Sequence, residues 1–195
     1  MKGKSIVGVI IIIVVVALSA YIVGIKSSSD GGAGSSIMDS QGSKAPTGGY
    51  GNGNAPVAFN EVLHELKSLV EKDPNNAELH SRLGDAYFDM KDFNSAVVSY
   101  KKAISINPSD VDAYNDLALS YHYLDNTAEG LAYVNQGIEK NPGYQRIWLT
   151  KGFLMAFGVG SSEEAAAALQ KAHELDPTTP VGQAAKAYLE ELRNK

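Results

Sequence analysis

The chain has 195 residues, with 22 acidic and 17 basic side chains that give a formal net charge of −5. The acidic excess lies in residues 57–195, which hold twenty Asp or Glu and thirteen Lys or Arg. Nucleic-acid binding needs clustered Lys and Arg, so we expect no nucleic-acid partner. The chain contains no cysteine, which excludes disulfides, cysteine-ligated zinc and thiol catalysis within it.

The first predicted element is an apolar helix. Ser5 to Ile25 is a run of 21 residues without a charge. At about 1.5 Å per residue, a helix of this length spans the hydrocarbon core of a bilayer. Residues 1–26 are therefore predicted to form a single transmembrane anchor that meets the membrane through residues 5–25. The alternative is a cleaved signal peptide, since a basic start also precedes an apolar run in such segments.

The charges that flank the apolar run predict an orientation. Lys2 and Lys4 lie on its N-terminal side, and Lys26 alone lies directly after it. Positive charge favours the cytoplasmic side of a membrane. This predicts a cytoplasmic N-terminus and a folded domain on the extracytoplasmic (periplasmic or cell-surface) side.

Residues 27–56 are predicted to form a disordered, flexible linker. They contain eight Gly and seven Ser in 30 residues, a composition that buries too little apolar surface to offset the entropy of ordering the chain. The linker is either a tether that lets the domain search for partners near the membrane or a spacer that needs only flexibility.

A fixed period dominates residues 57–195, the predicted folded domain. Four prolines, each preceded by Asn or Asp, recur at separations of 34, 34 and 35 residues: Pro74, Pro108, Pro142 and Pro177. Proline cannot continue a helix, so each one marks the end of a helical segment. A period of this size indicates stacked supersecondary units. Three units are predicted, at residues 77–110, 111–144 and 145–179.

Small residues recur at positions 8, 20 and 27 of the units. In the third unit the last two are shifted by one extra residue, which we place in the turn at 158–162. The small residues are Gly84, Ala96 and Ala103, then Ala118, Gly130 and Gly137, then Gly152, Ala165 and Ala172. We expect each unit to be two antiparallel helices whose backbones approach closely at these positions. The pattern resembles the tetratricopeptide repeat (TPR) family over residues 77–177, with Lys151 as a departure at a usual Leu position.

The resemblance implies an all-α fold, a TPR superhelix (α-solenoid) of three repeats with flanking helices. Before the repeats, Asn60–Lys72 has an apolar face and is expected to be the second helix of a half-repeat. After them, residues 180–193 are expected to form a polar-backed capping helix. About eight helices and no sheet are predicted. Asn75, Ser109 and Ser161 are the expected N-caps, since an acidic residue follows each three positions later.

The resemblance also implies a concave groove, lined by the first helices of the repeats, that holds a peptide or a partner helix. The predicted groove is acidic at the first repeat and aromatic at the third. Its residues are Glu78, Asp85, Phe88, Asp89, Asn115, Leu119, His122, Tyr123, Arg146, Leu149, Phe153 and Phe157. The alternative is that the aromatic side chains belong to the core and the acidic ones to a solvated face.

Two other functions find little support. Some TPR proteins hold the terminal carboxylate of a chaperone in a Lys/Asn/Arg clamp, but of the matching positions only Asn115 and Arg146 suit an anion, and Asp85 would repel it; Ser81 and Thr150 complete the set. The four histidines are far apart in sequence and no nucleophile or zinc-protease motif is present. We therefore expect no enzyme activity, no metal site and no cofactor.

The sequence thus predicts a membrane-tethered adaptor or assembly factor that binds a partner polypeptide in its groove. Its layout is similar to that of bacterial membrane-anchored TPR factors in cytochrome c maturation, secretion or envelope complex assembly. The alternative is a structural scaffold that associates with copies of itself through the repeat stack.

The helix predicted at residues 127–140 should be the softest in the stack. Gly130 and Gly137 each cost about 1 kcal/mol in helix propensity relative to Ala. Amide hydrogen exchange should therefore be faster in this helix than in the other helices of the three repeats. If it proved to be the best protected helix, this prediction would fail.

Overall fold

The computed structural model describes the backbone of residues 55–194 and the side chains of residues 60–194. The predicted membrane anchor, its orientation and nearly all of the predicted linker lie outside these residues. Within the described part, no helix combines the length and the apolar character that a bilayer crossing requires.

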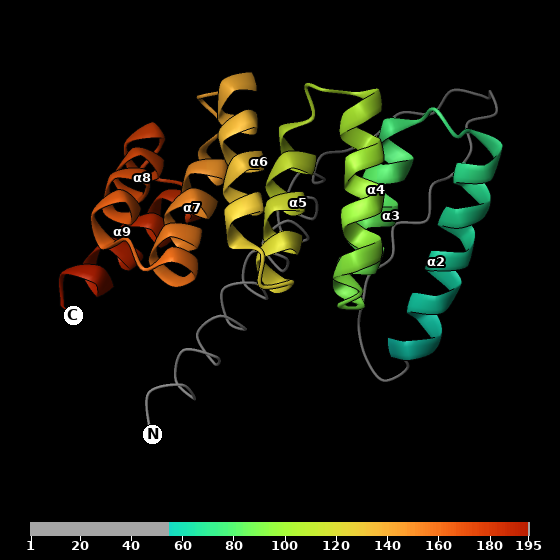
Figure 1. Ribbon diagram of the computed structural model, residues 1–195, viewed down its shortest axis with the longest axis horizontal. Helices are drawn as coiled ribbons and strands as arrows, with labels where there is room; N and C mark the ends of the chain where they lie inside the picture. The colour runs from blue at the N-terminus through green and yellow to red at the C-terminus, as the bar shows by residue number, and fades with distance from the viewer. Residues whose placement is uncertain (1–54, 195) are drawn as a thin grey trace, which may run out of the picture. The chain divides into compact units, whose positions relative to one another are not determined.

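Residues 55–194 contain eight α-helices, one π-helical segment and no strand, which confirms the predicted all-α fold for this part of the chain. The helices stack side by side from α2 to α9 (Figure 1). They are α2 (Ala55–Lys72), α3 (Ala77–Asp89), α4 (Phe93–Ile106), α5 (Val111–Tyr123), α6 (Thr127–Lys140), α7 (Gln145–Phe153), η1 (Leu154–Val159), α8 (Ser162–Leu175) and α9 (Pro180–Arg193). Helix α2 begins five residues before the expected Asn60.

Three helix pairs form the repeats. Helices α3 and α4, α5 and α6, and α7 and α8 make the most extensive contacts in the domain, and α2 and α9 pack against the two ends of the stack. The first helix of each repeat also contacts the first helix of the next. Each turn within a repeat contains one residue with a left-handed backbone, at Lys91, Asp125 and Gly160.

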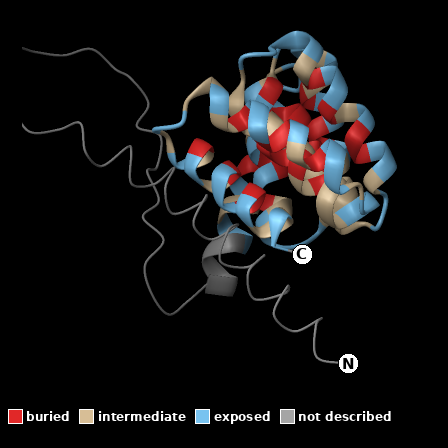
Figure 2. Cartoon of the chain, turned by 90° about the vertical axis from the view of Figure 1, so that its left-hand side faces the viewer, coloured by how far each residue is buried: buried red, intermediate tan, exposed pale blue. Residues whose placement is uncertain are grey.

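The small residues lie between the paired helices, as predicted. All five alanines at these positions are fully buried: Ala96, Ala103, Ala118, Ala165 and Ala172. A Cβ atom added to Gly84 would lie 2.5 Å from the ring of Tyr100, and one added to Gly152 would lie 2.5 Å from Leu169. Figure 2 shows the buried residues gathered on the inner faces of the helices. The small side chains therefore set the distance between the helices of a pair.

The N-caps differ by one residue from two of the predictions. The side chain of Asn76, not Asn75, accepts the backbone N–H of the first turn of α3, and Asp110, not Ser109, does so for α5. These two residues directly precede the helix, where a side-chain oxygen can reach the third helical N–H. Ser161 does precede α8 as predicted, but its side chain makes no capping hydrogen bond.

The extra residue of the third repeat lies in the end of a helix and not in the turn, contrary to the prediction. A closing hydrogen bond runs from Asp92 N to Tyr87 O in the first repeat, and from Ser161 N to Met155 O in the third, both at 2.9 Å. The hydrogen bond in the third repeat spans one residue more than that in the first. The π-helical segment η1 contains this extra residue, since a π-turn accommodates a single insertion. The turn itself keeps its left-handed residue.

Gly130 should be required at its position although Ala is the better helix former. A Cβ atom at residue 130 would lie 2.6 Å from the backbone carbonyl oxygen of Ala118. We expect Gly130→Ala to lower the free energy of unfolding by about 1–3 kcal/mol through overpacking, as measured by denaturant unfolding. An increase in stability would contradict this close approach.

The matched control is Ala132→Gly, on the exposed side of the same helix. It should cost about 1 kcal/mol through helix propensity alone.

Candidate partner-binding face

The first helices of the repeats and the capping helix form one surface. Helix α5 contacts α3 and α7, and α7 contacts α9. We call the surface shared by these four helices the A-helix face. All twelve predicted groove residues lie on α3, α5, α7 or η1, so the stack brings them onto neighbouring elements of this face.

A network of charged and polar groups joins α5 to α7 on this face. Arg146 on α7 contacts two carboxylates of α5, with its Nη1 3.3 Å from Oδ1 of Asp112 and its Nη2 2.9 Å from Oδ1 of Asp116. The hydroxyl of Tyr144 also donates to Asp112. The charge of Asp116 raises the pKa of Arg146, so the guanidinium stays charged. The arginine is thus already paired within the protein.

Asp85 lies on α3 beside this network. Part of its side chain is exposed, while its Oδ1 faces inward and accepts a hydrogen bond of 2.8 Å from the hydroxyl of Tyr100, which is buried. Desolvation by the surrounding helices, reinforced by the charge of Asp116, raises the pKa of Asp85 to about 7. Desolvation and Asp116 also raise the pKa of Asp89, one helical turn further on. The carboxylates lie close enough to repel one another, so this part of the face favours a cation.

A continuous row of aromatic rings crosses the stack. Ring centroids are 4.7–6.5 Å apart along the row, from the start of α4 across α3, α5 and the end of α7 to α9. We call it the aromatic row; its members are Phe93, Phe88, Tyr123, His122, Phe153, Phe157 and Tyr188. Burial lowers the pKa of His122, which keeps that ring neutral near pH 7. Each ring except Tyr188 is half-buried, so the row packs within the stack and also presents apolar surface to solvent.

The structure separates the predicted groove residues into three groups. Glu78, Asp85 and Asp89 are exposed, and Leu119, Arg146 and the aromatic residues are half-buried. Asn115 and Leu149 are 0% and 4% exposed, which leaves them no surface to offer a partner. The side-chain oxygen of Asn115 accepts from Thr150 at 2.7 Å, and its amide donates to Asp116 at 2.9 Å.

Three participants were absent from the predicted set. Asp116 holds Arg146, Phe93 stacks on Tyr123 with centroids 4.7 Å apart, and Tyr188 ends the aromatic row. Tyr188 follows Phe153 by 35 residues, so extending the repeat period into the capping helix would have identified it. Phe93 is on a second helix, which the groove offsets do not cover.

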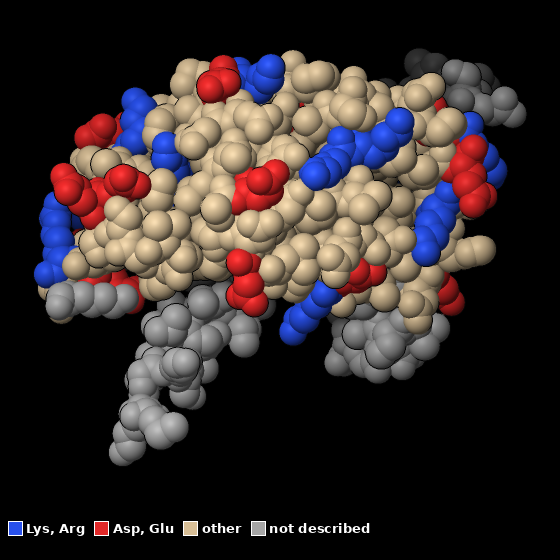
Figure 3. Space-filling view, viewed as in Figure 1, with Lys and Arg blue, Asp and Glu red and all other residues tan. Residues whose placement is uncertain are grey.

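The structure gives a physical reason why a carboxylate clamp does not form here. Of the two suitable residues, Asn115 is buried and Arg146 is neutralised by two aspartates. The face drawn in Figure 3 has no continuous basic patch, because Lys and Arg are interspersed there with Asp and Glu. Within the described residues, no group of three or more His, Asp or Glu side chains could hold a metal ion.

Asp85 should make stability depend on pH. Its pKa is about 7 in the folded chain and about 3.9 when unfolded, so the folded chain holds a proton that the unfolded chain releases. The resulting stabilisation is fully present below the lower pKa and is lost as pH rises through about 7. The melting temperature of the wild type should fall between about pH 5 and pH 8. That of Asp85→Asn should fall less over the same range, because the asparagine side chain cannot ionise.

The control is Glu78→Gln, which removes one negative charge from the same helix and should keep the wild-type slope. An equal pH slope in wild type and Asp85→Asn would show that Asp85 does not titrate in this range.

Comparisons with known proteins agree with this geometry. A model of the TPR repeat matches residues 84–125. The chain is similar to Hsp70-Hsp90 organizing protein 3 of Arabidopsis thaliana, with 33% identity over 97 residues; the match spans 50% of this chain and only 17% of that protein. The fold resembles that of the crystal structure of MamA, with a TM-score of 0.59, 20% identity and coverage of 72% of this chain and 90% of that one.

A second solved structure is the first TPR of Spaghetti (RPAP3) bound to the HSP90 peptide SRMEEVD. It has a TM-score of 0.55 and 21% identity, and covers 60% of this chain and 90% of that one. The repeat match at residues 84–125 and the arrangement of the helices together show that residues 55–194 have an all-helical, TPR solenoid-like fold.

Proposed function

We propose that this protein is an adaptor whose A-helix face binds a segment of a partner polypeptide. The observation that carries the proposal is the aromatic row, which crosses all three repeats and has six of its seven rings half-buried. Aromatic side chains in a partly desolvated setting, bordered by charges, are the usual anchors of protein interfaces. The match to the TPR repeat model at residues 84–125 and the similar fold of the peptide-bound TPR of Spaghetti also support the proposal.

The charges on the face define the chemistry of the partner. Asp85 and Asp89 lie within one helical turn of Phe88 on α3. Arg146, which also lies on this face, is already paired with Asp112 and Asp116. A partner segment with a basic side chain next to apolar ones complements this arrangement. The peptide in the Spaghetti complex contains two Glu and one Asp, and the same face of this chain would repel it.

A membrane tether would place the adaptor at a bilayer surface. The uncharged run at residues 5–25 supports an anchor, and Lys2 and Lys4 support a cytoplasmic N-terminus with the domain outside. The Gly/Ser-rich residues 27–56 would then give the domain its reach. In this arrangement the protein holds a partner close to the membrane, as an assembly factor for cytochrome c maturation, secretion or envelope complexes would.

Site-specific crosslinking in cells tests the proposal. A photoreactive amino acid replaces Leu119, at the centre of the face, or Glu139, exposed on α6, in the full-length chain. We expect position 119 to capture a distinct partner, and Asp89→Lys to reduce its yield by about tenfold through repulsion of a basic side chain. Mass spectrometry identifies the product.

The matched control is Glu139→Lys, the same reversal of charge away from the face, which should leave the yield unchanged. Identical products from positions 119 and 139, or a yield that Asp89→Lys does not change, would remove the A-helix face from the interaction. A crosslinked product that consists only of two copies of this chain would favour the self-associating scaffold instead.

A further inference from the structure

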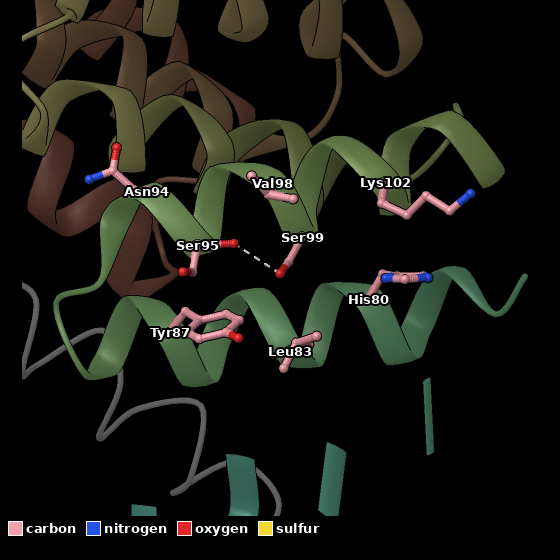
Figure 4. A pocket seen from close by; sticks show the side chains of 8 residues that line it. All are labelled: His80, Leu83, Tyr87, Asn94, Ser95, Val98, Ser99 and Lys102. Carbon is pink, nitrogen blue, oxygen red and sulfur yellow. Dashed lines mark hydrogen bonds between the residues drawn. The ribbon is translucent and has the colours of Figure 1, made fainter. Parts of the chain in front are cut away.

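A second candidate surface lies away from the A-helix face, between α3 and α4. It is a pocket of about 500 Å³, within the range typical of ligand sites. Figure 4 shows His80, Leu83 and Tyr87 on α3 beside the neighbouring α4, with His80 and Lys102 at one end. The remaining lining comes from α4: Asn94, Ser95, Val98 and Ser99.

The second repeat shows what fills the corresponding place there. Tyr121 and Tyr133 occupy the positions 34 residues after Tyr87 and Ser99. Their rings stack with centroids 5.6 Å apart and planes 8° apart. Lys101 covers the pair, with its Nζ 5.4 Å from the centroid of Tyr121 and 5.8 Å from that of Tyr133. In the second repeat this site therefore holds two stacked rings with a lysine above them.

The first repeat keeps the lysine and one ring but lacks the second ring. Lys67 precedes Lys101 by 34 residues, and its Nζ lies 5.5 Å from the centroid of Tyr87. Ser99 stands where the second repeat has Tyr133, and its hydroxyl turns away to donate to the carbonyl of Ser95 at 2.9 Å. The pocket thus lies above Tyr87, where an aromatic ring is missing.

The rim of the pocket is apolar and basic. Val98 is 69% exposed, more than the other two exposed large hydrophobic side chains of the described residues, Met90 and Val159. Lys102 lines the pocket and Lys67 borders it, whereas no Asp or Glu belongs to the lining. Val98 thus adds an apolar side chain to the edge of the pocket, and the two cations favour acidic groups on whatever enters it.

We propose that this pocket binds an aromatic side chain, Tyr or Phe, of a partner polypeptide in which acidic residues flank the aromatic one. The incoming ring stacks on Tyr87 beneath Lys67 and completes the arrangement that Tyr121, Tyr133 and Lys101 form in the next repeat. The flanking carboxylates face Lys67 and Lys102. This surface is separate from the A-helix face and binds a partner of the opposite charge.

The experiment measures fluorescence anisotropy of labelled peptides with the full-length chain in detergent. The probes are a hexapeptide with one Tyr between Asp and Glu residues, the same peptide with Ala for Tyr, and the same with Lys for the acidic residues. Wild type should bind the first peptide most tightly. Replacing Tyr by Ala should weaken binding about tenfold or more, the loss typical of a removed aromatic anchor.

Two variants test the pocket itself. Ser99→Tyr fills it with the ring that the second repeat uses, so it should abolish the preference for the Tyr peptide and raise the melting temperature. Val98→Asp repels the acidic flanks without filling the pocket, and should also weaken binding. The matched controls, Ser105→Tyr and Ser105→Asp, lie on the same helix outside the lining and should bind as wild type does.

The proposal is overturned if the Tyr and Ala peptides bind equally, or if Ser99→Tyr, shown to be folded by circular dichroism, binds the Tyr peptide as wild type does. Equal binding of the lysine-flanked peptide overturns the acidic chemistry of the partner. A Tyr50→Ala variant that binds the probe more tightly than wild type would show that the chain's own Tyr50 occupies the pocket. A dimer that Ser99→Tyr dissociates would make a second copy the occupant.

Discussion

The close approach of paired helices at small residues is the constraint on which the rest of the structure depends. Alanine or glycine stands at each of nine recurring positions, and all of these residues are buried. A larger side chain at any one would push its pair apart, since cores tolerate overpacking poorly. Among the glycines at these positions, Gly130 lies closest to the backbone of the paired helix, because even a Cβ atom there would meet the carbonyl of Ala118. The spacing of the pairs then fixes which residues of successive first helices become neighbours.

That spacing explains why charges and rings from distant parts of the sequence form one surface. Arg146 reaches Asp112 and Asp116, 34 and 30 residues earlier, because α7 lies against α5. The aromatic row depends on the same stacking, since the contacts of Phe88 with Tyr123 and of His122 with Phe153 join different repeats. The face is acidic beside the row, whereas the α3–α4 pocket is bordered by lysines. One short stack thus presents two surfaces of opposite character, which suits a protein that brings two polypeptides together.

Much of the fold could be predicted because its signals are local in sequence. Prolines at a fixed period mark the ends of second helices, and small residues at fixed offsets mark the close contacts. The N-caps were less certain, since neighbouring residues such as Asn75 and Asn76 both have capping side chains and only the backbone geometry selects one. The insertion was placed in a turn, but Leu154 is fully buried in the core, so the helix continues and absorbs the extra residue as a π-turn.

The candidate site could be predicted only in part. Offsets of the first helices located the acidic residues and most of the aromatic row, but could not show that Asn115 is consumed by hydrogen bonds within the stack. The pocket results from a single difference between repeats: the first has Ser99 where the second has Tyr133. This difference could be interpreted only from the structure, in which Tyr133 stacks on Tyr121. Such features depend on side-chain contacts within and between repeats, and a periodic pattern does not specify them.

The most direct test of the account is amide hydrogen exchange of the full-length chain with and without the partner captured from position 119. If the A-helix face binds that partner, slower exchange should appear on α3, α5 and α7, strongest near Asp89 and Tyr123. Protection confined to α4, α6 and α8 would contradict the account, because the partner would then contact the second helices of the repeats.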